Sequence, residues 1–214
     1  MARMTGRWAA KFDIEMDKNP ESPWNPREST QITPTEFELQ VQQWLRGSAT
    51  NLGDLAVVHQ GKVESAGGSE YAIDVLATFS AFEGAQFTVL IECKHQKRPV
   101  ERDEVLILEA KRADVAAQKA MLFSTAGFQS GALEYATAHQ IATITVVPGK
   151  WLYETKGAGP AGEPPPWIPI KKWAGIRVTQ TERGVSCHTL DADRLDALTE
   201  WLRSAIDPGN QQLG

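Results

Sequence analysis

Hydrophobic and polar residues alternate along two neighbouring stretches near the middle of the chain, residues 72–79 and 87–94. Alternation with a period of two, rich in β-branched and aromatic residues, is typical of β-strands. The residues between them, 80–86, include Gly84 and are predicted to form a hairpin loop. The two stretches are therefore expected to pair as an antiparallel hairpin.

The same alternation predicts the register of this hairpin. If the hairpin is symmetric about Glu83, Phe79 faces Phe87 and Asp74 faces Glu92. A slip by one residue would bury the polar face and expose the apolar one, so the register is well determined. Carboxylates opposed across two strands, with Cβ atoms about 4.5–5.5 Å apart, repel each other. A cation is therefore expected between the two acids.

Lys94 belongs to the same predicted face as Glu92, about 6.6 Å further along the strand. Two acids and a lysine are thus predicted to converge. Taken singly, Asp74 and Glu92 would be ordinary solvated acids at strand ends, and Lys94 an ordinary surface lysine. Their position on one face among hydrophobic residues favours a functional site.

A helix is predicted to begin at Thr33 and to end near Gly47. Thr33 and Glu36 form a capping box, and Pro34 suits the first helical position. Glu38 lies at the edge of the apolar stripe of this helix. It either leans toward the sheet or is a solvated glutamate of the first turn, and its spacing does not decide between the two. The apolar stripe consists of Phe37, Val41, Trp44 and Leu45.

Further strands are predicted at 55–59, 120–124 and 141–147, and further helices at 101–119 and 128–140. The order is then helix, three strands, helix, strand, helix, strand. A meander followed by alternating helix and strand predicts an α/β fold, a mixed β-sheet sandwiched by helices.

The chain divides by composition into four parts. Residues 1–32 are polar and proline-punctuated, and they are predicted to be an arm in front of the core at 33–156. A Pro/Gly-rich linker follows at 157–169. The extension at 170–214 is predicted to hold a hairpin and a last helix capped by Asp191. Because the extension is small, it is expected to pack on the core or on a second copy of the chain.

Composition and charge narrow the class of protein. With 214 residues, 42% hydrophobic and 23% charged, the chain is globular. Two cysteines, Cys93 and Cys187, exclude a disulfide framework and a CxxC metal site. No apolar run suits a signal peptide or a membrane span, so a cytoplasmic location without membrane association is expected. The net charge of −5 argues mildly against a polyanionic partner, although a metal ion bound by several acids would weaken this objection.

The ordered motifs resemble the Mrr-type catalytic domain of the PD-(D/E)xK superfamily of restriction-endonuclease-like nucleases, over roughly residues 33–152. Each motif alone is weak, but the ordered set is more specific. Glu92 stands where Mrr-type domains often carry glutamine, and Ile73 stands where the superfamily has proline. The motifs that carry the resemblance are Phe37-Glu38, Ile73-Asp74, Ile91-Glu92-Cys93-Lys94 and the run from Phe123 to Phe128.

The resemblance implies that Asp74, Glu92 and Glu38 bind a metal ion and that Lys94 is the catalytic lysine. Carboxylates suit Mg²⁺, a hard ion that prefers oxygen ligands, and Mn²⁺ is expected to substitute for it. The resemblance further implies an endonuclease that hydrolyses DNA in restriction or anti-phage defence. A homodimer is expected because cutting both strands needs two sites. Lys94 would orient or deprotonate the attacking water, or stabilise the pentacoordinate phosphorus.

Candidate contacts to DNA lie beside this site. Basic residues begin at Lys94, and a strand end leads into a helix N-terminus near residue 128, where phosphate groups bind readily. For His95, an exposed histidine without a role is the alternative. The candidate contacts are Lys94, His95, Lys97, Arg98, Ser124 and Gln129.

Two other functions fit the same sequence. The first is an inactive nuclease fold that binds nucleic acid or a protein partner, which the intact Asp74, Glu92 and Lys94 argue against. The second is a structural subunit that acts through the C-terminal hairpin and helix. Removing residues 160–214 would then abolish partner binding and spare any nuclease activity.

Overall fold

A seven-stranded mixed sheet forms the centre of the protein, and its strands lie side by side in chain order. The structure, a computed structural model, describes residues 30–48, 53–81, 84–150, 169–181 and 184–204. The first two pairs of neighbouring strands are antiparallel, the next two pairs are parallel, and the last two pairs are antiparallel. The strands are β1 (Gly53–Glu64), β2 (Glu70–Ala81), β3 (Ala85–Lys94), β4 (Lys119–Ser124), β5 (Ala142–Pro148), β6 (Trp173–Thr181) and β7 (Gly184–Leu190).

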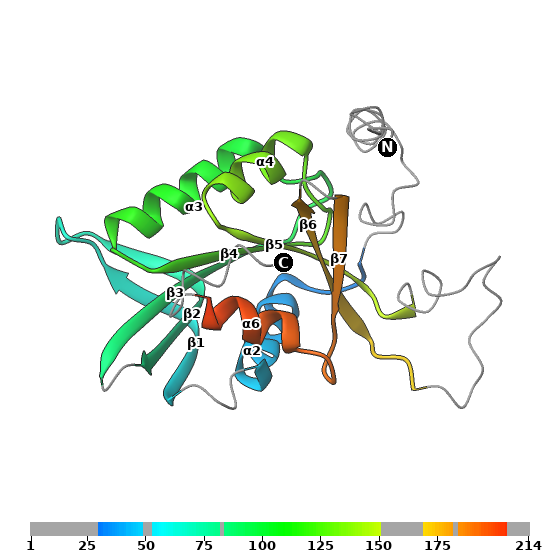
Figure 1. Ribbon diagram of the computed structural model, residues 1–214, viewed down its shortest axis with the longest axis horizontal. Helices are drawn as coiled ribbons and strands as arrows, with labels where there is room; N and C mark the ends of the chain where they lie inside the picture. Colours follow the sequence, from blue (N-terminus) through cyan, green and yellow to red (C-terminus); the bar gives the residue numbers. More distant parts are fainter. Residues whose placement is uncertain (1–29, 49–52, 82–83, 151–168, 182–183, 205–214) are drawn as a thin grey trace, which may run out of the picture.

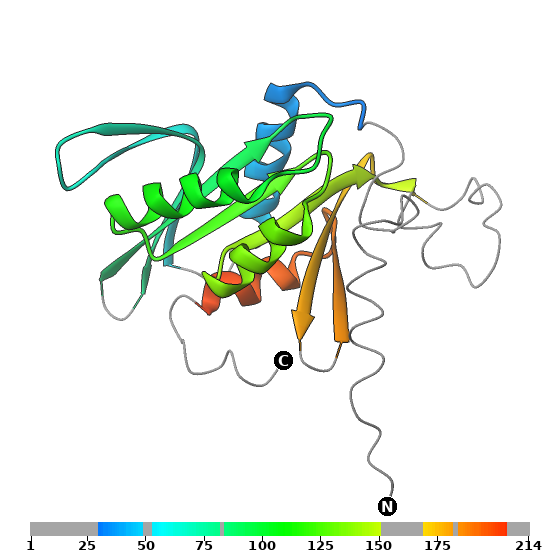
Figure 2. The same ribbon diagram turned by 90° about the horizontal axis from the view of Figure 1, so that it is seen from above.

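Helices cover both faces of this sheet. Figure 1 shows α3 and α4 on one face and α2 and α6 on the other, and Figure 2 shows α3 and α4 lying across the strands. Each face has its own apolar core. The predicted α/β sandwich is therefore confirmed. The helices are α2 (Pro34–Ser48), α3 (Arg102–Asp114), α4 (Ser130–Ala138) and α6 (Asp196–Arg203).

The predicted register of the β2–β3 hairpin is confirmed where the two strands pair. Phe79 lies opposite Phe87, and their rings stack with centroids 5.2 Å apart. The loop, however, is shorter than the predicted 80–86, because the ladder continues through two more pairs to Ala81 and Ala85. Gly84, at φ 124, supplies the backbone conformation that lets the chain turn within so few residues.

Several element ends differ from the prediction for local reasons. β1 extends to Glu64, well beyond the predicted 55–59, because it pairs along the full length of β2. α3 ends at Asp114, and Ala116 then takes a left-handed conformation at φ 52 that a helix cannot contain. Asp191 does not cap α6, since Leu195 holds that position and the Asp191 carboxylate accepts a hydrogen bond from the Asp193 N–H at 2.9 Å.

The capping box that opens α2 is present as predicted. The Thr33 N–H donates to the Glu36 carboxylate at 3.0 Å, and the Glu36 N–H donates to the Thr33 hydroxyl at 3.3 Å. The stripe that includes Trp44 is at most 1% exposed and packs on the sheet. The capping box therefore fixes where α2 begins, and the apolar stripe fixes which side of α2 faces the core.

The C-terminal hairpin and helix join the same architecture. β6 pairs with β5, so the sheet is continuous across the predicted linker. In α6, Leu198, Trp201 and Leu202 are buried in the core that also holds α2. The Thr199 hydroxyl donates to the Ser48 carbonyl at the end of α2. The segment from β6 to α6 thus packs on the core, which is one of the two arrangements predicted for it.

The predicted arm at 1–32 and linker at 157–169 lie almost wholly outside the described residues. The division of the chain into four parts therefore stays a prediction. In the part that the structure describes, none of the helices combines the length and apolar character needed to cross a membrane.

Candidate active site

Strands β2 and β3 separate at Asp74, and the Asp74 side chain there accepts a hydrogen bond that a backbone carbonyl would otherwise accept. The β2–β3 ladder ends with the pair Val75 and Ile91. One residue further, the Asp74 Oδ2 atom accepts a hydrogen bond from the Cys93 N–H at 2.7 Å. In a continuing antiparallel ladder, a backbone carbonyl of β2 would be the acceptor. The sequence thus places a carboxylate where two strands diverge.

The side-chain alternation of β2 shifts at the same point. Val75 packs in the core under α2, whereas Ile73 packs with Leu90 in the core under α3 and α4. Strict alternation predicts that Ile73 and Val75 share a face, and this prediction is wrong. Opposite on β1, Gln60 takes a left-handed conformation at φ 51, which marks the local distortion of the neighbouring strand.

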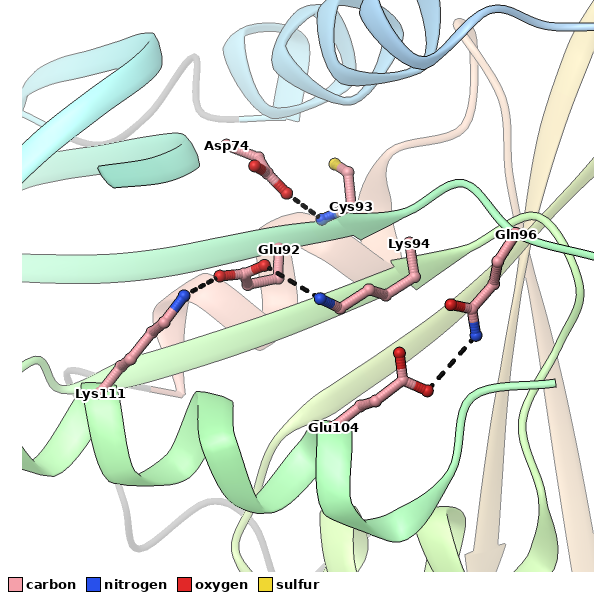
Figure 3. Close-up of polar contacts among 7 residues, drawn as sticks. All are labelled: Asp74, Glu92, Cys93, Lys94, Gln96, Glu104 and Lys111. Carbon is pink, nitrogen blue, oxygen red and sulfur yellow. Dashed lines mark hydrogen bonds and ion pairs between the residues drawn. The ribbon is translucent and has the colours of Figure 1, made fainter. Parts of the chain in front are cut away.

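Glu92 lies at the centre of a charged group on β3. It is only 8% exposed, although it is an acid. The Lys94 Nζ atom lies 3.5 Å from Glu92 Oε2, and the Lys111 Nζ atom contacts Glu92 Oε1 (Figure 3). The sequence pattern predicts the first lysine but not the second. Lys111 reaches Glu92 from α3, which crosses this face of the sheet.

Asp74 does not share the face of Glu92 and Lys94, contrary to the prediction. Figure 3 shows Asp74 on the side of β3 that faces α2, while Glu92 and Lys94 lie on the side that faces α3. The acids nevertheless interact. Burial is the main cause that raises the pKa of Asp74, and the negative charges of Glu92 and Glu38 raise it further against the Cys93 hydrogen bond and the charge of Lys94. The site therefore concentrates negative charge around the end of β3.

Glu38 leans toward the sheet, which the sequence left open. Its Oε2 atom lies 2.6 Å from His59 Nε2, and the two side chains are 17% and 22% exposed. His59 belongs to β1 and faces Val75 in the β1–β2 register. Sequence reasoning missed His59, because only the three-dimensional packing of α2 on β1 brings it to Glu38.

The predicted DNA contacts have different surroundings. The His95 ring nitrogen Nε2 lies 2.7 Å from the Ile32 carbonyl, and Arg98 pairs with Glu101 at 2.7 Å. Lys97 and Gln129 are exposed. Ser124 is fully buried, and its hydroxyl accepts a hydrogen bond from the Ala126 N–H at 3.1 Å. In this arrangement Ser124 cannot reach DNA, whereas the other contacts stay predictions.

The raised pKa of Asp74 has a consequence for stability. A carboxyl group whose pKa is raised in the folded state stabilises the fold at low pH, and this contribution is lost as the pH rises through the raised pKa. Asp74→Asn keeps an acceptor for the Cys93 N–H without the charge. We expect it to raise the melting temperature at about pH 7 by on the order of 2 °C, and by less at about pH 4.

Thermal unfolding at both pH values measures this difference. The matched control is Glu134→Gln, which removes an exposed carboxylate on α4 and should change the melting temperature equally little at either pH. A lower melting temperature for Asp74→Asn at neutral pH would contradict the expectation.

Comparison with known protein families identifies the family of this chain. The model of the Mrr catalytic domain, described as a restriction endonuclease, matches residues 29–155, more than half of the chain. The chain belongs to the Mrr-type restriction endonuclease family. It therefore contains a restriction-endonuclease-like catalytic domain, and the predicted resemblance is confirmed. No curated protein matches the chain.

Two solved structures share weak similarity with this Mrr-family chain. One is the crystal structure of a protein of unknown function, AF1548, with 16% identity, a TM-score of 0.34, and coverage of 47% of this chain and 56% of that one. The other is EndoMS in apo form, with 14% identity, a TM-score of 0.25, and coverage of 66% and 47%. The chain spans about half the length of these two proteins.

The PD-(D/E)xK nucleases, to which the Mrr family belongs, typically use a divalent metal ion. Among the described residues, no three histidine, cysteine or acidic side chains gather closely enough to form a metal cage. Mg²⁺ does not need such a cage, since it commonly binds one or two carboxylates together with water and substrate phosphates. The hard oxygen donors of Asp74 and Glu92, and the negative charge that acts on Asp74, fit such an ion.

Proposed function

We propose that this protein is a Mg²⁺-dependent endonuclease that hydrolyses phosphodiester bonds of DNA in restriction or anti-phage defence. The observation that supports it best is the buried Glu92 with Lys94 beside it, next to Asp74 where β2 and β3 separate. This group lies within the matched Mrr domain. Mn²⁺ would substitute for Mg²⁺, and a homodimer would provide one site for each DNA strand.

In the proposed reaction, Asp74 and Glu92 would hold the ion from the two sides of the end of β3, and Glu38 would add negative charge from α2. When bound, Mg²⁺ would polarise a phosphoryl oxygen and lower the pKa of a water molecule. The water gives up a proton as its oxygen forms a bond to phosphorus. The bond between phosphorus and the leaving sugar oxygen breaks, and that oxygen takes up a proton, so that one water is added across the bond. Lys94 would orient or deprotonate the water, or stabilise the negative charge on the oxygens of the pentacoordinate phosphorus.

The contacts of the other residues suit supporting roles. His59 holds the Glu38 carboxylate through its Nε2 atom at 2.6 Å, so it fixes the direction of this acid. The exposed Lys97 and Arg98 lie three and four positions after Lys94 and would contact the DNA backbone. Gln129, at the start of α4, would bind a phosphate near the helix N-terminus.

Cleavage of a supercoiled plasmid tests this function. Lys94→Ala is expected to slow cleavage in Mg²⁺ by about 10²–10⁴-fold, which is typical for the loss of a group that assists proton transfer or charge stabilisation. Chelation of the metal should stop the wild-type reaction. Lys62→Ala is the control, because Lys62 is an exposed lysine that pairs with Glu70 on the β1–β2 hairpin.

Two results would argue against the proposal. If Lys94→Ala cut as fast as Lys62→Ala, Lys94 would have no part in catalysis. If the wild-type protein bound DNA without cutting it in Mg²⁺ or Mn²⁺, the inactive binding module would be favoured.

A further inference from the structure

Glu92 has two cationic partners, and the nearer one comes from α3 rather than from its own strand. The Lys111 Nζ atom contacts Oε1, whereas the Lys94 Nζ atom lies 3.5 Å from Oε2. Figure 3 shows the two lysines approaching the carboxylate from opposite sides. Each oxygen of Glu92 therefore already faces an ammonium group.

On the side of β3 that faces α3, this arrangement carries more positive than negative charge. One carboxylate, 10% exposed in its side chain, faces two ammonium groups. Asp74 does not balance the surplus at Lys111, because it lies on the other side of β3 and accepts the Cys93 N–H. In the described part of the chain, Glu92 is the acid that pairs with Lys111. A further negative group beside Lys111 would therefore bind favourably.

A divalent cation and an ammonium group repel each other, so an ammonium group at each oxygen of Glu92 opposes metal binding there. Glu92 therefore binds a metal ion more tightly once a lysine has left one of its oxygens. The backbone of Lys94 is held in β3, and its side chain is 31% exposed. Lys111 stands on a helix, its side chain is 23% exposed, and its long flexible stem can turn outward. Lys94 is needed beside Glu92 in the proposed reaction, so Lys111 is the lysine that can withdraw.

We propose that Lys111 is the counter-ion of Glu92 when no metal is bound, and that it passes to a DNA phosphate when a divalent cation takes its place. This inference rests on the proposed nuclease function and adds a residue to it. Because DNA offers Lys111 a new partner, DNA strengthens metal binding. By linkage, the metal strengthens DNA binding by the same factor. Lys111 thus couples the binding of the metal ion to the binding of DNA.

Mn²⁺ binding to the full-length protein measures this coupling without relying on cleavage. The free ion is followed by electron paramagnetic resonance, with and without a DNA duplex carrying phosphorothioate linkages. Lys111→Met removes the ammonium group and keeps the length of the side chain. Without DNA, this variant is expected to bind Mn²⁺ about 5-fold more tightly, the lower end of typical coupling. It should also lose most of the increase in affinity that DNA causes.

Lys62→Met is the matched control, because Lys62 also pairs with a glutamate, Glu70, but both are exposed on the β1–β2 hairpin. It is expected to bind Mn²⁺ as the wild type does. Lys111→Gln, which keeps a hydrogen-bond donor for Glu92 without the charge, is the second variant in case the methionine variant does not fold. It should shift the affinity in the same direction.

Unchanged Mn²⁺ affinity in the Lys111 variants would overturn the inference. Weaker affinity would also overturn it, since Lys111 would then organise Glu92 rather than compete with the metal. The Glu92→Ala variant distinguishes failure of the inference about Lys111 from failure of the proposed nuclease function. If Glu92→Ala abolished Mn²⁺ binding while Lys111→Met had no effect, only the role of Lys111 would fall. If the wild type bound no Mn²⁺ with or without DNA, both proposals would fall.

Discussion

Glu92→Ala is expected to reduce DNA cleavage by about 10³-fold or more, the scale on which loss of a central electrostatic group acts. The variant removes a ligand of the proposed metal ion and leaves Lys94 and Lys111 without their shared acid. It is also expected to lose about 1–2 kcal/mol of stability. This is less than the loss for a fully buried pair, because the lysine side chains are 31% and 23% exposed and can turn to water.

Single-turnover plasmid cleavage and urea unfolding measure the two effects separately. Glu70→Ala is the matched control, since Glu70 pairs with Lys62 but is 57% exposed in its side chain. It should change cleavage little and stability by less than about 0.5 kcal/mol. Glu92→Gln should lie between wild type and Glu92→Ala, because an amide oxygen still binds a cation weakly. Cleavage by Glu92→Ala at the wild-type rate would remove Glu92 from the site.

Trp44→Ala is expected to cost about 3–5 kcal/mol of unfolding free energy, as for other large aromatic residues removed from a core. Trp44 is 1% exposed, and its ring lies 6.4 Å from that of Phe123 on β4. The loss is a large part of the 5–15 kcal/mol that typically stabilises a domain. The variant should therefore melt well below the wild type and lose activity through unfolding.

Urea unfolding at 25 °C compares Trp44→Ala with Leu39→Ala. Leu39 belongs to the same helix but is 44% exposed, so its loss should cost less than about 1 kcal/mol. If the two variants were equally stable, Trp44 would not anchor α2 to the sheet.

The local pattern of hydrophobic and polar residues was sufficient to predict those parts of the fold that depend on residues close together in the sequence. The β2–β3 register followed from the alternation on both strands, since Phe79 and Phe87 could meet on the apolar face in only one way. The start of α2 followed from Thr33 and Glu36, whose side chains and backbone groups satisfy each other. These features arise within a few residues, where periodicity and capping act directly.

The parts that the sequence did not predict depend on contacts between distant elements. Lys111 meets Glu92 because α3 packs across β3, which no spacing along the chain encodes. His59 meets Glu38 through the packing of α2 on β1. The shift of faces at Asp74 comes from the separation of two strands, an irregularity that strict alternation cannot express. The candidate site is therefore less predictable than the fold that carries it.

The contact between α2 and α6 joins the earliest helix of the described chain to the latest. A truncation that removes residues 160–214 would strip Leu198, Trp201 and Leu202 from the core against which α2 rests. Shortening the chain therefore cannot separate a catalytic half from a binding half. Heat or denaturant should therefore unfold α2 and α6 together in one cooperative transition. Because Glu38 belongs to α2, its carboxylate keeps its orientation only while α6 remains packed on the core.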